Sequence, residues 1–106
     1  MLVAESSGHA KALLTLYEGK QSGAVDCAVN VRLLVGAEEP HPHQMRFLNW
    51  EYTLDGGQTF LALPPTTRAT TRIGGLTPLT TVGVRVSLYN STGAGPWSQV
   101  VSILVR

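Results

Sequence analysis

The chain has 106 residues, of which 43% are hydrophobic and 14% are charged, and its formal net charge is +1. This length suits one domain, and the high apolar content with low net charge excludes a disordered segment. The eight Lys and Arg residues are scattered, which argues against a nucleic-acid-binding face. No apolar run approaches the roughly 20 residues of a membrane-spanning helix, so we expect no membrane insertion. The single cysteine, Cys27, excludes an internal disulfide.

The first half of the chain predicts a tail followed by two strands. Residues 1–10 show no regular period, and we expect a flexible or partly helical tail there, with the folded domain spanning 11–106. Apolar residues then recur at every second position over 11–17 and 25–35, which places them on one face of a β-strand. Cys27 lies on the apolar face of the second run, so we expect an inert, buried thiol.

The second half predicts five more short strands. Residues 48–54 alternate around Trp50, and Asp55-Gly56-Gly57 predicts a hairpin turn. Further runs over 59–63, 69–73, 82–89 and 97–105 complete the pattern. Strands with one apolar face must bury it against another layer. The sequence therefore predicts an all-β fold, an antiparallel seven-stranded β-sandwich of immunoglobulin-like type, with a barrel as the alternative.

Four segments of the second half resemble the fibronectin type III family: 50–60, 71–80, 84–86 and 93–98. In that family such segments form strands C and C′ with their hairpin, strand E with a Leu-x-Pro-x-Thr corner, strand F, and the Gly-x-Gly-Pro-Trp-Ser start of strand G. The Asp-Gly-Gly hairpin is similar to that of bacterial members. The resemblance implies fibronectin type III topology and an extracellular or cell-surface location.

The chain departs from the family pattern at two core positions. The usual strand B tryptophan is absent, because the matching stretch offers Val29 and Val31, and the usual tyrosine after the corner threonine is replaced by Val82. We therefore expect Trp50 to fill the centre of the core. We also expect Leu76 and Pro78 to hold the E–F corner by packing.

Catalytic and cofactor-binding motifs are absent from the sequence. It contains no nucleophile elbow, no His-Glu-x-x-His motif and no phosphate-binding loop, so we predict neither an enzyme nor a cofactor. Glu38, Glu39, His41 and His43 are residue types that bind Zn, Cu or Ni. They stand on a loop without the surrounding partners that orient metal ligands. They are weak candidates for a metal site, and a solvated loop is the simpler interpretation.

The candidate interaction surface consists of Arg85, Trp97 and the loop that follows strand F. Arg85 on the outer face of that strand and Trp97 at the start of the last strand predict a guanidinium–indole stack, which either caps the sheet or serves as a binding platform. Asn90, Ser91 and Thr92 belong to the adjoining loop. The family's Arg-Gly-Asp adhesion motif is absent from this loop.

These observations predict a non-catalytic fibronectin type III-like module of a bacterial protein, acting as a spacer or as a protein- or glycan-binding domain. The partner is not identified by the sequence. The alternative is a self-associating structural domain, a homodimer paired through edge strands such as the apolar Val100–Val105 run. A metal site at His41 and His43 is the remote alternative.

Overall fold

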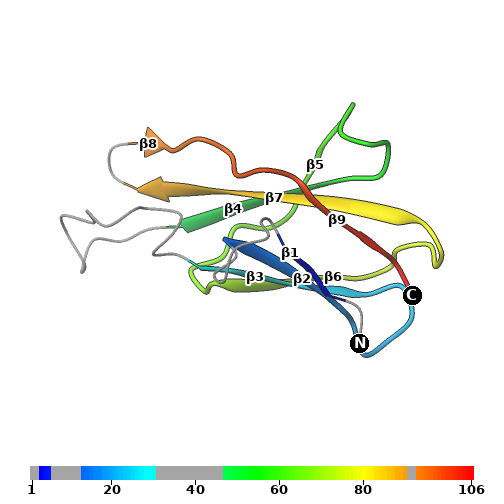
Figure 1. Ribbon diagram of the computed structural model, residues 1–106. Helices are drawn as coiled ribbons and strands as arrows, with labels where there is room; N and C mark the ends of the chain where they lie inside the picture. The colour runs from blue at the N-terminus through cyan, green and yellow to red at the C-terminus, as the bar shows by residue number, and fades with distance from the viewer. Residues whose placement is uncertain (1–2, 6–12, 31–46, 91–92) are drawn as a thin grey trace.

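Figure 1 shows the computed structural model as two stacked β-sheets. The structure describes residues 3–5, 13–30, 47–90 and 93–106, and all regular elements in these ranges are strands. Their bounds are β1 Val3–Glu5, β2 Leu14–Glu18, β3 Val25–Val29, β4 Phe47–Thr53, β5 Leu61–Ala62, β6 Thr70–Ile73, β7 Thr81–Asn90, β8 Gly93–Ala94 and β9 Val101–Leu104.

The two sheets are antiparallel throughout the described residues. The first has the order β1-β2-β3-β6; in the second, β5, β4 and β7 are neighbours, and both β8 and β9 pair with β7. β8 and β9 are two parts of one interrupted edge strand, and β1 is a short addition to the edge of β2. The remaining framework has three strands in one sheet and four in the other. This arrangement confirms the predicted seven-stranded, immunoglobulin-like β-sandwich.

The core lies between the sheets and is built from the alternating apolar positions. Trp50 has the largest of the fully buried side chains and is 1% exposed, which confirms its predicted place in the core. Its indole Nε1–H donates a hydrogen bond of 2.8 Å to Thr66 Oγ1, so the one polar atom of the ring is satisfied. The other core side chains are Leu14, Leu16, Val25, Cys27, Val29, Leu48, Ile73, Leu76, Val82, Val84, Val86, Val101, Ile103 and Val105.

Three element boundaries differ from the sequence-based expectation. Val3–Glu5 forms β1 inside the segment predicted to be a flexible or partly helical tail, because the backbone groups on the free edge of β2 offer hydrogen-bond partners. The rest of 1–10 lies outside the described residues. The final strand begins at Val101 rather than at 97, after an interruption at Pro96, whose nitrogen cannot donate to a ladder. The predicted return strand over 59–63 shortens to β5.

The corner between β6 and β7 is held in a different way from the one predicted. Leu76 is buried as expected, but Pro78 is exposed and does not pack into the core. Backbone hydrogen bonds hold the corner instead: Leu79 N–H donates to Val105 O at 2.8 Å, and Val105 N–H donates to Thr80 O at 2.8 Å. The Thr80 hydroxyl also donates to the carbonyl of residue 77 at 2.6 Å.

Candidate functional site

The outer face of the second sheet carries three cross-strand pairs that point away from the core. In register order along β4 and β7 they are Phe47 with Tyr89, Asn49 with Ser87, and Glu51 with Arg85. Directly opposed side chains on neighbouring antiparallel strands lie close enough to interact. The face therefore presents an aromatic pair, a polar pair and an ion pair in succession.

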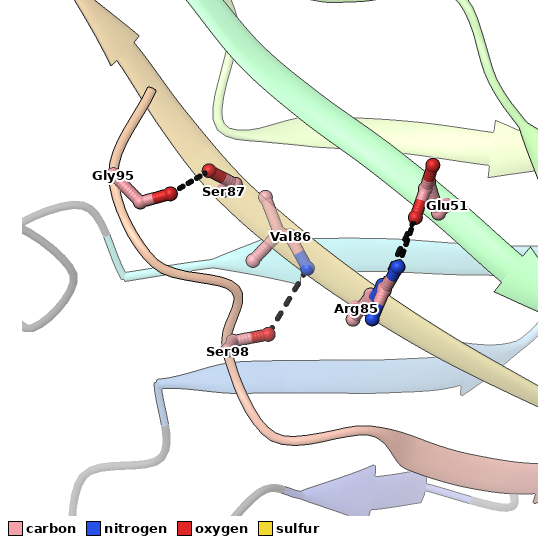
Figure 2. Close-up of polar contacts among 6 residues, drawn as sticks. All are labelled: Glu51, Arg85, Val86, Ser87, Gly95 and Ser98. Atoms are coloured by element: carbon pink, nitrogen blue, oxygen red, sulfur yellow. Dashed lines mark hydrogen bonds and ion pairs between the residues drawn. The ribbon is translucent and has the colours of Figure 1, made fainter. Parts of the chain in front are cut away.

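Arg85 is held by three neighbours. Its Nη2 and Nε donate to Glu51 Oε1 at 2.5 and 3.0 Å, and Figure 2 shows the two side chains reaching toward one another across β4 and β7. The guanidinium carbon lies 3.6 Å from the ring centroid of Phe60 and 4.4 Å from that of Trp97. The predicted stack of Arg85 on Trp97 is thus confirmed. Phe60 and Glu51 are further partners that the sequence analysis did not identify.

These contacts give the Arg85 guanidinium its charge and stacking partners within the domain itself. The ion pair is only partly exposed, with 25% of the arginine side chain and 23% of the glutamate side chain accessible, so solvent weakens it less than a fully exposed pair. Two aromatic contacts add roughly 0.5–1 kcal/mol each. The geometry supports a structural role for the stack. A role of Arg85 and Trp97 in partner binding stays a prediction.

The segment between β8 and β9 is tied to β7 by two serine hydroxyls (Figure 2). The Ser87 hydroxyl donates to Gly95 O at 2.8 Å. Val86 N–H donates to Ser98 Oγ at 3.0 Å, while Ser98 N–H donates to Val86 O at 2.8 Å. In an unbroken ladder a backbone carbonyl oxygen would accept the hydrogen bond from Val86 N–H. Here the Ser98 hydroxyl oxygen accepts it instead. As a result the chain crosses over Ser87, which is 1% exposed.

A groove lies beside the aromatic pair. It is lined by Phe47, Asn49, Pro65 and Tyr89, and its volume is about 530 Å³. Phe47 is 38% exposed and Tyr89 is 47% exposed, which is high for aromatic side chains. The sequence analysis missed this groove because Phe47 precedes the run that it assigned to a strand and Pro65 comes from the segment after β5. The available signal was Tyr89 at an outward position of the run over 82–89.

Most of the other predicted site residues fall outside the described part of the chain. Glu38, Glu39, His41, His43, Ser91 and Thr92 all lie in the undescribed ranges. Asn90 ends β7 and pairs with Gly93. Within the described ranges no group of three potential metal ligands comes together, and no helix is long and apolar enough to cross a membrane.

Cys27 is unsuited to nucleophilic chemistry. It is 1% exposed, and burial, together with the neighbouring Asp26 charge, raises the pKa of its thiol to about 12. The thiolate is the reactive form of cysteine, and such a pKa makes it rare at neutral pH. The predicted burial of this side chain is confirmed.

Comparison with known proteins supports the fold. No protein-family model matches the chain, and no curated protein matches it. Among solved structures, it is similar to the solution structure of the sixth fibronectin type III domain of human fibronectin type III domain containing protein 3. The TM-score is 0.64 at 23% sequence identity, over 85% of this chain and 79% of that one. The likeness shows that the chain has a fibronectin type III-like fold.

Proposed function

We propose that the chain is a non-catalytic module of a larger bacterial protein, acting as a spacer or as a domain that binds a protein or a glycan. The observation that favours the binding role is the outer face of β4 and β7, where Phe47, Tyr89 and Trp97 are each more than a third exposed. Aromatic side chains are enriched where proteins bind partners, because they bury a large area at a small cost in side-chain entropy.

The fibronectin type III-like fold supports a non-enzymatic role in general terms. The bacterial assignment depends on a smaller feature, the Asp55-Gly56-Gly57 hairpin between β4 and β5. The reading frame of the parent gene and the genes beside it test that assignment directly. A eukaryotic gene context would contradict it.

Glycan and protein arrays probed with the isolated, labelled domain test the binding role. We expect a ligand that the wild type retains and that a folded outer-face variant, Trp97→Ala or Tyr89→Leu, loses. Leu79→Ala is the matched control, since Leu79 is 80% exposed at the β6–β7 corner and lies away from this face. Equal retention by all variants would contradict binding through the outer face, and an array without any ligand would favour the spacer role.

Self-association through β9 is the second candidate function. This strand pairs with β7 on one side, and no other strand pairs with it within the described residues. Val100 and Leu104 are 42% and 48% exposed, and no charged residue occurs between Pro96 and Val105 to discourage pairing with another chain. Light scattering across a concentration series tests this function. A strict monomer at every concentration would contradict it.

A further inference from the structure

We propose that the groove between Phe47 and Tyr89 binds one neutral pyranose ring of a glycan. This inference rests on the proposed binding role and gives that role a place and a ligand class. It concerns the groove alone, and not the Arg85 stack farther along the sheet.

The groove has the dimensions of a small-molecule subsite. Its volume of about 530 Å³ falls within the roughly 300–1,000 Å³ of typical ligand pockets. Phe47 and Tyr89 lie directly opposite one another on β4 and β7, and both side chains line the groove. Pro65, from the segment after β5, adds a third apolar side chain to the described lining.

The chemistry of the lining favours a ligand that is apolar on its faces and polar at its edge. Aromatic and proline rings offer flat apolar surfaces, and the Asn49 amide offers two hydrogen-bond donors and one acceptor. A pyranose presents axial C–H groups on its face and hydroxyls around its rim. A fatty acyl chain would leave the Asn49 amide unpaired, which costs binding free energy.

The charge of the groove lining helps to distinguish a neutral sugar from an acidic ligand. No charged side chain lines the groove among the described residues. Farther along the described part of this face, Glu51 and Arg85 form an ion pair with one another. Phosphate, sulfate and carboxylate groups are normally recognised by Arg or Lys. The four described lining side chains are all uncharged, which suits a neutral sugar.

The length of the groove argues against an extended peptide. A proline-rich peptide also binds grooves lined by aromatic side chains, but it needs several successive pockets. Here the next position along β7 is Ser87, which is 1% exposed because the chain at Gly95 covers it. Along β7 the covered Ser87 therefore ends the groove beyond Asn49, so no further pocket follows in that direction.

Amide NMR titration of the whole 106-residue chain tests this inference, with cellohexaose, chitohexaose and maltohexaose as neutral probes and a proline-rich decapeptide as the competing class. We expect one of the sugars at about 1 mM to shift the amides of Phe47, Asn49 and Tyr89. Tyr89→Phe keeps the ring and should keep binding. Tyr89→Leu keeps the apolar bulk without an aromatic face and should weaken binding about tenfold.

Leu79→Ala serves as the control, and thermal melting shows whether each variant is folded. Two results would overturn the inference: no sugar shifts the groove amides, or Tyr89→Leu binds the sugar as tightly as the wild type. If only the decapeptide shifts the groove amides, the ligand of the groove is a peptide and not a sugar. That result would leave the proposed binding function standing. If the Trp97→Ala variant loses an array ligand that the Tyr89→Leu variant retains, the groove is not the binding site. The proposed binding function of the domain would then still stand.

Discussion

Replacement of Trp50 tests the centre of the core. The side chain is 1% exposed, and Trp50→Ala deletes the whole buried indole. Truncation of a buried aromatic to alanine costs about 3–5 kcal/mol, against a total stability of about 5–15 kcal/mol for a domain. We therefore expect Trp50→Ala to be unfolded or to melt far below the wild type.

Trp50→Phe separates packing from hydrogen bonding. Phenylalanine keeps much of the apolar volume but loses the Nε1–H donor that lies 2.8 Å from Thr66 Oγ1. Thr66 keeps a partner, because its hydroxyl donates to Arg68 O at 2.7 Å. The lost hydrogen bond costs about 1 kcal/mol, and the missing part of the indole about 1 kcal/mol more. We expect about 2 kcal/mol in all, clearly less than for Trp50→Ala.

Urea unfolding followed by far-ultraviolet circular dichroism measures both effects, since the shift in midpoint at constant slope gives the change in free energy of unfolding. Thr66→Val completes a double-mutant cycle, in which the coupling should be about 1 kcal/mol. A Trp50→Ala variant with an unchanged midpoint would refute the core assignment. A Trp50→Phe variant as unstable as Trp50→Ala would show that the hydrogen bond, and not packing, dominates.

Three further predictions concern polar contacts and the thiol. Ser98→Ala leaves the Val86 N–H without its acceptor and should lower stability by about 1–3 kcal/mol by thermal denaturation, whereas Ser98→Thr should cost less; equal costs would contradict the role of the hydroxyl. Hydrogen bonds to Asp55, foremost from the Thr59 hydroxyl, lower the pKa of its carboxyl below the unfolded value of about 3.9. The resulting stabilisation is fully present above the unfolded pKa and is lost as pH falls toward the folded one, so Asp55→Asn should flatten the acid side of a plot of urea midpoint against pH; an unchanged slope would contradict this. Because the pKa of Cys27 is raised to about 12, iodoacetamide should modify the thiol in urea but not in the native protein; rapid native labelling would contradict its burial.

The sequence was sufficient to predict the layers and most of the core. Strict alternation in β3, β4 and β7 determines which side chains face inward, because a strand has only two faces. Trp50 and Leu76 were predicted to be buried and are buried. Pro78 was assigned to packing through the family resemblance, yet the backbone hydrogen bonds around Val105 hold that corner. A sequence motif does not reveal which of its residues make the contacts that hold the corner.

The site depended on contacts that alternation does not encode. The partners Glu51 and Phe60 approach Arg85 from β4 and from the hairpin after it, and this proximity follows from strand register. Register is a property of paired strands and cannot be derived from one strand's pattern. The groove similarly brings Phe47 and Pro65 together from separate segments. The alternation over 82–89 placed Tyr89 on the outer face, but it did not reveal that Phe47 lies opposite to it.

At Gly83 the strand register reverses the change in stability that the sequence alone predicts for a substitution by alanine. Within a strand, glycine is less stable than alanine by roughly 0.5–1 kcal/mol, so the sequence alone favours Gly83→Ala as a stabilising change. In the sheet, however, a Cβ at this position would lie 2.7 Å from Val100 Cγ1 and 2.9 Å from Thr53 Cγ2. Both distances are shorter than a normal carbon–carbon contact. The cost of such overpacking is typically about 1–3 kcal/mol.

The two crowded neighbours differ in their freedom to move. Val100 is 42% exposed and can rotate away, whereas Thr53 is 3% exposed and is fixed by its hydroxyl, which donates to Asp55 at 2.8 Å and accepts from Gly57 N–H at 3.0 Å. We therefore expect Gly83→Ala to lower the melting temperature and Gly83→Ala/Val100→Ala to recover only part of the loss. A single variant that melts above the wild type would show that Thr53 gives way and that the intrinsic cost of glycine decides the outcome.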